Sequence, residues 1–338
     1  MKETYRKMIE TLSACRRVLI TTHVRPDGDA VGTAAAMALG MRRRGIDSRV
    51  LLLSRLPGKY AFVLKENDIG FDEVETAWPR DFSLQGYDAL LVVDTGTWSQ
   101  LPGLKERIDG WSKPRLVLDH HLTQEDWADV KVVEPEAAAA GEIAAELLAQ
   151  WNVPVDPAIA AALFLAIASD TGWFQFSNTR PATLRLAAEL MEAGVDTDKM
   201  YQHLYQNERA ERMALQTRAQ DSLELLDQSR LAVMSVRKSD FEHTHARLSD
   251  TENLINVPLQ IRTVEVSILI VEPPDGSAIR VSLRSKGQVD VAKFAEQFGG
   301  GGHARAAGLK IPGPFEHVRG LVSSEMIKTL GSIPAATT

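Results

Sequence analysis

Residues 17–29 read Arg-Val-Leu-Ile-Thr-Thr-His-Val-Arg-Pro-Asp-Gly-Asp, and this segment indicates an α/β fold. The apolar, β-branched run 17–22 is typical of a buried parallel strand, which places His23 at its carboxyl end, where α/β sheets bind ligands. Asp27 and Asp29 flank a glycine, so both carboxylates can point toward the imidazole. Carboxylates this close repel each other unless a cation lies between them. One imidazole with several carboxylates suits Mn²⁺ before Zn²⁺ and does not suit a thiolate-binding metal. The alternative interpretation is an Asx turn that caps the next helix.

Length and composition indicate a soluble globular protein with two domains. The chain has 338 residues, of which 44% are hydrophobic and 25% charged, enough for two separate cores. Its net charge of −7 argues against a general nucleic-acid coat protein but leaves room for a phosphate substrate, because bound metals add local positive charge. Cys15 is the only cysteine, which excludes a disulfide framework and a cysteine metal cluster. The first residues lack a signal peptide's apolar core and no apolar run reaches membrane-spanning length, so we expect a cytoplasmic protein.

Further apolar runs end in polar residues as the first one does. Strand 87–93 ends at Asp94, and strand 114–118 leads directly into Asp119, His120 and His121. Three strands that each deliver a metal-competent residue at the carboxyl end favour an α/β fold with a doubly wound, mostly parallel sheet. The helical run 158–168 stops just before Asp170. This aspartate is a further candidate ligand, and the alternative is an ordinary helix-terminal residue.

The remaining patterns divide the chain into parts. Residues 1–190 are predicted to form the metal-binding domain, 191–228 a helical linker, and 229–338 a smaller α/β domain. Within the first part we expect a strand at 49–53 and helices at 3–15, 30–41, 137–150 and 181–193. A helix at 197–206 and a polar helix at 210–228 follow, and the polar helix has little to bury.

The second half of the chain has a glycine run that suggests an anion site. Strands are predicted at 231–236, 264–272 and 278–285 and a short helix at 289–298, before four glycines at 299–302. Ordering four glycines costs much backbone entropy, so we expect them to let backbone N–H groups approach an anion. His303 and Arg305 lie beside the run, and Ser282, Arg284 and Ser285 offer a phosphate contact if their strand ends at the same face. The alternative is a flexible hairpin with solvated charges.

These motifs resemble a known family. His23-x-x-x-Asp27-x-Asp29, Asp94, Asp119-His120-His121 and Asp170 match in order the four motifs of the DHH phosphoesterases. The glycine run with His303, preceded by Ser282-x-Arg284-Ser285, looks like the substrate-binding DHHA1 domain. A chain with only these two domains most resembles the group that combines nanoRNase (oligoribonuclease) and 3′-phosphoadenosine-5′-phosphate (pAp) phosphatase activities. The resemblance implies that the DHHA1 domain lies across a cleft from the catalytic domain.

The resemblance also implies roles for individual residues. One divalent metal ion would be held by His23, Asp27 and Asp94, and a second by Asp29, Asp94, His120 and Asp170, with Mn²⁺ preferred over Co²⁺ and Mg²⁺. His121 would face the scissile phosphate, where it could protonate the leaving oxygen, and Asp119 would orient a histidine. The implied substrate-binding residues are Ser282, Arg284, Ser285, Gly300, Gly301, Gly302, His303 and Arg305.

Three functions are compatible with this resemblance. The first is a two-metal hydrolase that degrades very short single-stranded RNA to mononucleotides and converts pAp to AMP. The second is a phosphodiesterase for cyclic dinucleotides or their linear dinucleotide products, and the third is a non-catalytic nucleotide-binding module. We expect no membrane and no long duplex nucleic acid among its partners, and a homodimer is left open.

Other candidate residues have structural alternatives that we prefer. His243 and His245 are expected on the surface because their short polar segment supplies too few ligands. His203 and His317 lie on predicted amphipathic helices without acidic partners, which favours a structural or solvated role. Trp173 could stack a base, together with Phe174 beside it, but both fit a hydrophobic core at least as well.

Overall fold

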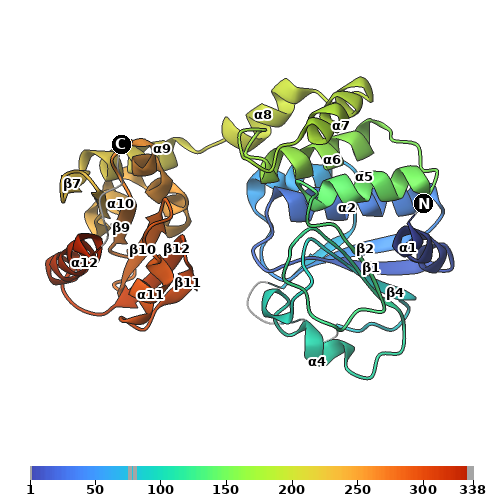
Figure 1. The fold of residues 1–338 in the computed structure, drawn as a ribbon, viewed down its shortest axis with the longest axis horizontal. Helices are drawn as coiled ribbons and strands as arrows, with labels where there is room; N and C mark the ends of the chain where they lie inside the picture. The colour runs from blue at the N-terminus through green and yellow to red at the C-terminus, as the bar shows by residue number, and fades with distance from the viewer. Residues whose placement is uncertain (1, 75–77, 79–81, 333–338) are drawn as a thin grey trace. The chain divides into compact units, whose positions relative to one another are not determined.

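Two β-sheets organise the chain, each in its own compact unit (Figure 1). The computed structural model describes residues 2–74, 78 and 82–332. The units are Met1–Asn207 and Glu208–Thr338. The segment 191–228, expected to be a linker, is thus divided between them: Met200 belongs to the core of the first unit and Leu215 to a core of the second.

The first unit contains a sheet in which all paired strands are parallel. The strand order is β3-β2-β1-β4-β5-β6, in which the direction of winding reverses between β1 and β4. In a doubly wound sheet, ligands bind outside the carboxyl ends of the strands at this reversal point. The strands are β1 Arg17–Thr21, β2 Asp47–Leu52, β3 Phe71–Glu73, β4 Ala89–Val93, β5 Arg115–Asp119 and β6 Val130–Val133.

Helices cover both faces of this sheet, which confirms the predicted doubly wound α/β fold. On one face, α1, α2, α5 and α6 share a core with β1, and on the other face α4 packs against side chains such as Leu90 and Val117. The helical elements are α1 Glu3–Ser13, α2 Gly28–Arg43, η1 Gly58–Tyr60, α3 Ala61–Lys65, η2 Trp98–Gln100, α4 Leu104–Ile108, α5 Ala140–Gln150, α6 Pro157–Asp170, α7 Pro181–Glu192 and α8 Thr197–Tyr205.

Glycines bring α2, α5 and α6 unusually close together. A Cβ atom on Gly32 of α2 would lie 2.5 Å from the carbonyl oxygen of Ala162, and one on Gly141 of α5 would lie 2.5 Å from the Cβ of Ala166. Both neighbours belong to α6. The close approach matters for the site because α2 begins, and α6 ends, at residues that carry candidate metal ligands.

The second unit contains a mixed sheet, also as expected for its α/β class. The order is β11-β12-β10-β9-β8-β7, with β8 and β9 parallel and the other pairs antiparallel. One face packs against α11 and α12, and the other is covered over β8 and β9 by α9, α10 and η4. The elements are α9 Ala210–Asp221, β7 Glu224–Leu226, β8 Leu231–Val236, α10 Lys238–Thr244, η3 Leu248–Thr251, η4 Leu254–Gln260, β9 Val266–Val271, β10 Ile279–Ser285, α11 Val291–Glu296, β11 Gly301–His303, β12 Ala306–Ile311 and α12 Phe315–Gly331.

The glycine run builds a β-hairpin in this sheet. Gly301 and Gly302 lie in β11, which pairs with β12 across a two-residue turn. A Cβ atom on Gly300 would lie 2.5 Å from the carbonyl oxygen of Gly308, and one on Gly302 would lie 2.5 Å from that of Ala306. These two glycines are therefore required by the close approach of β12, a reason that the sequence pattern did not reveal.

No helix in the described ranges is long and apolar enough to cross a membrane.

Candidate metal centre

The candidate ligands meet at the carboxyl edge of the first sheet, where its winding reverses. His23 follows β1 and Asp94 follows the neighbouring β4, while Asp119 ends β5 and is followed by His120. Two helices complete the edge. The N-terminus of α2 carries Asp27 and Asp29, and the C-terminus of α6 carries Asp170.

Asp94 lies between two groups of side chains. Its Oδ2 atom is 3.3 Å from Nε2 of His23, and its Oδ1 atom is 3.5 Å from Nε2 of His120. His23, Asp27 and Asp94 form one group of ligand atoms close enough to share a metal ion, which we call the His23 cluster. Asp29, His120 and Asp170 form a second group, the His120 cluster. The Asp94 carboxylate therefore reaches both clusters at once.

The backbone of Asp94 is strained. Its φ angle is +61°, in the left-handed region that residues with a Cβ atom rarely adopt, and its side chain is only 2% exposed. Its Oδ1 atom is buried without a hydrogen-bond partner among the described residues. Strain and an unsatisfied buried oxygen are both costly, and such features concentrate at functional sites.

The two histidines of the clusters are held in the same way. Nδ1 of His23 is 3.1 Å from the carbonyl oxygen of Val24, and Nδ1 of His120 is 3.1 Å from that of Ala137. A carbonyl oxygen only accepts, so Nδ1 carries a proton in both rings. In the neutral ring, the lone pair of Nε2 then faces the carboxylates, which is the usual arrangement of a metal-binding histidine.

Asp29 is buried and oriented by two helices. Its Oδ2 accepts a hydrogen bond from the N–H of Ala140 at 2.6 Å, and its Oδ1 accepts from the N–H of Gly141 at 3.0 Å and from the hydroxyl of Thr33 at 2.9 Å. Burial and the nearby charges of Asp94 and Asp170 raise the pKa of Asp29 well above its ordinary value.

Asp27 caps α2 and faces His23 at the same time. Its Oδ1 accepts from the N–H of Ala30 at 3.1 Å and lies 3.8 Å from Nε2 of His23. The alternative interpretation of this residue as a helix cap is therefore confirmed, and it coexists with the position of Asp27 in the His23 cluster. Gly28 beside it allows a close contact, because a Cβ atom there would overlap the side chain of Ser169, the neighbour of Asp170.

The negative charges of the carboxylates in the two clusters favour binding of a cation. Burial raises the pKa of Asp170 to about 6, with Asp94 adding to the shift against the opposing effect of His120. Burial alone would lower the pKa of His23, but the hydrogen bonds and charges of Asp27 and Asp94 raise it to about 11. The carboxylates thus hold protons on nearby imidazoles. A divalent cation would neutralise the same charges, and the imidazole and carboxylate donors suit a hard or borderline ion.

Asp119 holds His121 without belonging to either cluster. Its Oδ1 accepts from Nδ1 of His121 at 2.8 Å and from the backbone N–H groups of His120 and His121 at 2.8 and 3.1 Å. Burial would raise the pKa of Asp119, but the hydrogen bond from His121 keeps it below the ordinary value, and the same bond raises the pKa of His121. The side chain of His121 is 55% exposed, and because Nδ1 is bonded to Asp119, Nε2 is the ring nitrogen without a hydrogen bond among the described residues.

In the second unit, the sheet register places two predicted substrate-binding residues in one row. Arg284 of β10 pairs with Ala306 of β12, which pairs with His303 of β11. Residues directly opposite each other in an antiparallel sheet point to the same face. The row two residues along consists of Ser282, Gly308 and Gly301 on the same face. This face therefore has small residues between an arginine and a histidine.

Arg284 is half-buried, and no acidic partner for it is found in the described part of the chain. Its Nη1 donates to the carbonyl oxygen of Leu283 at 3.0 Å, and burial lowers the pKa of its guanidinium. Two other predicted residues lie differently. Ser285 points to the opposite face and its Oγ accepts from the N–H of Gly287 at 3.0 Å, while Arg305 lies in the turn of the hairpin.

The remaining histidines and aromatic residues do not join the clusters. His203 stacks on Phe62 at a centroid distance of 4.3 Å, and His243, His245 and His317 are exposed, as expected. The ring of Trp173 packs against Phe164, Phe174, Tyr201 and Tyr205.

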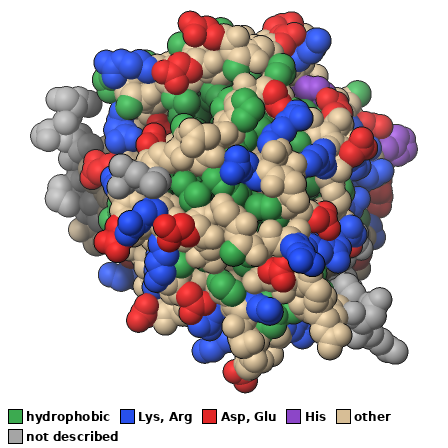
Figure 2. Space-filling view, turned by 90° about the vertical axis from the view of Figure 1, so that its right-hand side faces the viewer, with side chains coloured by type: hydrophobic (Ala, Val, Ile, Leu, Met, Phe, Trp, Pro, Cys, Tyr) green, Lys and Arg blue, Asp and Glu red, His purple; other side chains and the backbone are tan. Residues whose placement is uncertain are grey.

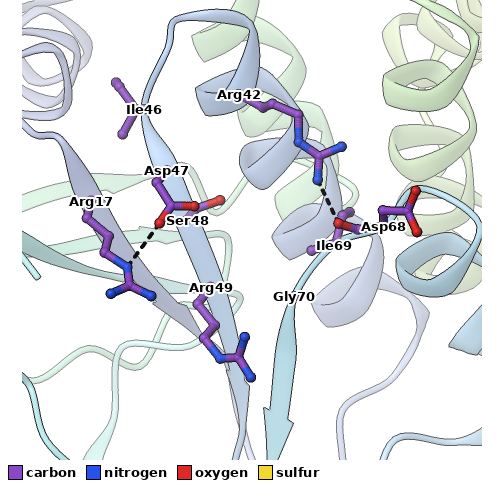
Figure 3. A pocket seen from close by; sticks show the side chains of 9 residues that line it. All are labelled: Arg17, Arg42, Ile46, Asp47, Ser48, Arg49, Asp68, Ile69 and Gly70. Carbon is purple, nitrogen blue, oxygen red and sulfur yellow. Dashed lines mark hydrogen bonds and ion pairs between the residues drawn. The ribbon is translucent and has the colours of Figure 1, made fainter.

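A pocket at the opposite edge of the first sheet contains three arginines, and each of them has a partner among the described residues (Figure 3). Arg17 pairs with Asp47 at 3.0 Å, Arg42 donates to the carbonyl oxygens of Asn67 and Asp68, and Arg49 pairs with Asp72. These side chains fasten β1, β2 and the segment before β3, so we assign the pocket a structural role.

Several groups that hold the candidate ligands escaped the sequence analysis. The backbone N–H groups of Ala140 and Gly141 carry no sequence signal, and neither does the side chain of Gln124, which donates to Asp119. Thr33 could have been found, because it lies one helical turn after Asp29.

Comparison with known proteins identifies the family of both units. The model of the DHH family, N-terminal domain, matches residues 17–167, and that of the DHHA1 domain matches residues 230–328. A Thermus thermophilus relative named bifunctional oligoribonuclease and PAP phosphatase NrnA is 28% identical, covering 96% of this chain and 95% of that protein. A Bacillus subtilis protein of the same name is 25% identical, covering 90% and 92%.

Solved structures show that the fold is shared. An exopolyphosphatase-related protein from Bacteroides fragilis has 21% identity and a TM-score of 0.84 over 96% of both chains. The exonuclease RecJ bound to manganese has 14% identity and a TM-score of 0.57, covering 98% of this chain and 94% of that one. The two family matches account for most of the sequence, and the chain combines an N-terminal domain of the DHH family with a DHHA1 domain.

Proposed function

We propose that this protein is a two-metal phosphoesterase that degrades very short RNA to mononucleotides and converts pAp to AMP. The observation that carries the proposal is the position of Asp94, whose two carboxylate oxygens face His23 on one side and His120 on the other. The relatives named oligoribonuclease and PAP phosphatase, which match over nearly their whole length, support the choice of substrates.

In this proposal, His23, Asp27 and Asp94 hold one ion, and Asp29, Asp94, His120 and Asp170 hold the other. We propose Mn²⁺, with Co²⁺ or Mg²⁺ as alternatives, and the RecJ neighbour was solved with manganese. When bound, two such ions polarise the phosphoryl group and lower the pKa of the attacking water.

His121 supplies the proton transfer. Asp119 accepts the Nδ1 proton and stabilises the imidazolium form, in which Nε2 carries a second proton that it can donate to the leaving oxygen. Asp119 itself stays ionised, because its pKa is held below the ordinary value.

The DHHA1 domain supplies substrate binding. Arg284, Ser282 and His303 would contact a phosphate or sugar of the substrate, and the backbone of Gly301 beside them would allow its close approach. Gly300 and Gly302 shape the hairpin, with Arg305 at its turn. Ser285 was expected in this group, and we propose that it supports the strand end through Gly287 instead.

We predict that Arg284→Ala and His303→Ala raise the KM for a dinucleotide and for pAp. Losing a charge-assisted hydrogen bond costs roughly 1.5–3 kcal/mol, or about ten- to a hundredfold in affinity. A small aryl phosphodiester, which has no second phosphate or sugar to bind, should be hydrolysed almost as before. Steady-state kinetics on both substrates would measure the difference.

Arg280→Ala is the matched control, because Arg280 is exposed on the same strand and face as Arg284 and pairs with Lys310 at the other end. It should leave both KM values unchanged. Equal losses on both substrates with unchanged metal content would show that this face does not bind the substrate.

A time course on labelled RNAs of two to twenty nucleotides, run with pAp and a cyclic dinucleotide, tests the proposed function. We expect Mn²⁺-dependent conversion of the shortest RNAs to mononucleotides and release of phosphate from pAp. Preferred cleavage of the cyclic dinucleotide would support the cyclic-dinucleotide phosphodiesterase instead, and binding without turnover would support a non-catalytic module.

The partners beyond the short substrates stay predictions. On the face drawn in Figure 2, acidic and basic side chains are interspersed without a broad area of positive charge. The cytoplasmic location and the homodimer remain to be tested.

A further inference from the structure

The side chain of Gln124 forms hydrogen bonds with Asp119 and His121 at the edge that carries the candidate ligands. Its Nε2 atom donates to Oδ2 of Asp119 at 2.5 Å and to the carbonyl oxygen of His121 at 3.0 Å. The other oxygen of Asp119, Oδ1, accepts three N–H groups, including Nδ1 of His121. The buried carboxylate thus has a separate set of donors on each oxygen, and Gln124 is the side chain that occupies Oδ2.

The position of Gln124 is set by the loop that follows Asp94. A Cβ atom on Gly96 would overlap the side-chain amide of Gln124, so the amide fits there only because residue 96 is a glycine. The carbonyl oxygen of Gly96 accepts from Nε1 of Trp127 at 2.9 Å and from the N–H of Glu125 at 3.2 Å. The loops after β4 and β5 are therefore fastened together around the Gln124 side chain.

We propose that Gln124 is a positioning residue that acts on His121 through Asp119. A carboxylate can turn about its last torsion and exchange its two oxygens between donors. With Oδ2 held by Gln124, Oδ1 stays directed at Nδ1 of His121, which fixes the ring and leaves Nε2 free. Without this donor, Oδ2 would be buried and unsatisfied, and the carboxylate would rotate to share its remaining donors. The inference rests on the proposed role of His121 as the proton donor.

Gln124→Met is the informative substitution, because methionine keeps the length of the side chain but has no N–H donor and no charge. We expect kcat for a dinucleotide to fall about tenfold or more, the usual effect of losing a hydrogen bond to a charged group. KM, the content of two Mn²⁺ per chain and the melting temperature should stay close to those of the wild type. Gly96→Ala, which displaces the amide, should lower kcat in the same way.

A double-mutant cycle tests whether the effect passes through His121. In a His121→Ala background, Gln124→Met should cause no further loss, because there is no imidazole left to position. Glu125→Ala is the matched control: it lies on the same loop, and within the described ranges its carboxylate has no hydrogen bond. It should behave like the wild type.

An NMR measurement tests the same inference without turnover. The side-chain Nδ1–H proton of His121 should give a hydrogen-bonded, exchange-protected signal in the wild type and in Glu125→Ala, and this signal should weaken or shift in Gln124→Met. The inference would be overturned by an unchanged Nδ1–H signal in Gln124→Met or by a loss of metal in that variant. It would also be overturned if the kcat losses of the two single substitutions multiplied in the double mutant. A wild type that hydrolyses no phosphoester while the signal behaves as expected would overturn the proposed function and leave the positioning role intact.

Discussion

Asp94→Ala is expected to abolish Mn²⁺-dependent hydrolysis, with a loss in kcat of about a thousandfold or more. The reason is its position, because the two carboxylate oxygens of Asp94 face His23 of one cluster and His120 of the other. Its removal should disturb both ions. Metal ions supply several kcal/mol of transition-state stabilisation, and each 1.4 kcal/mol corresponds to a factor of ten in rate.

Variants that lack a ligand of only one cluster provide the comparison for the metal content of Asp94→Ala. His23→Ala and Asp170→Ala each remove a ligand from one cluster. His23→Ala should therefore keep the ion of the His120 cluster more tightly, and Asp170→Ala should keep the ion of the His23 cluster more tightly. Metal content per chain, measured after dialysis against Mn²⁺, should therefore be lower in Asp94→Ala than in either variant. Activity of Asp94→Ala near the wild-type level would refute the two-metal assignment.

The second large effect separates the two adjacent histidines. His121→Ala should keep both metal ions and lose about 10²–10⁴-fold in kcat, the usual contribution of a general acid. His120→Ala should instead weaken binding of the ion in the His120 cluster. The structure motivates the difference, because Nε2 of His120 faces Asp29, Asp94 and Asp170, whereas Nδ1 of His121 is bound to Asp119.

Two measurements distinguish these roles. The metal content of each variant should differ as described, and equal metal loss in both would contradict the division. An aryl phosphodiester with a good leaving group needs little protonation, so His121→Ala should be much less impaired on it than on a dinucleotide. Equal impairment on both substrates would mean that His121 does not protonate the leaving oxygen.

The sequence predicts which residues follow the strands of the first sheet, because buried parallel strands leave a strong signal. Apolar runs such as 17–22 are bounded sharply by polar residues, and the residue after each run must lie at the carboxyl edge. The winding of the sheet then places His23 and Asp94 beside each other at the β1/β4 reversal. Asp170 was a weaker prediction, since only the end of a helical pattern located it.

Short strands and the glycine hairpin could not be predicted from local pattern. β3 and β6, of three and four residues, are edge strands that are partly exposed and lack a continuous apolar run. β11 consists of two glycines and a histidine and forms because β12 lies beside it. Its pairing is a tertiary property, and glycine-rich sequence favours a loop.

The contacts that hold the candidate ligands in place could not be predicted from the sequence either, because they also depend on tertiary structure. Asp29 is held by N–H groups more than 110 residues away, and Gln124 reaches Asp119 only because the loop folds against Gly96. For Ser285, the spacing predicts a phosphate contact, but strand alternation turns its side chain to the face opposite that of Arg284.

Anomalous diffraction from crystals grown with Mn²⁺ tests the metal centre most directly. We expect two manganese peaks about 3.5–4 Å apart, one in the His23 cluster and one in the His120 cluster, each in contact with a carboxylate oxygen of Asp94. A single peak, or two peaks of which neither contacts Asp94, would contradict this expectation.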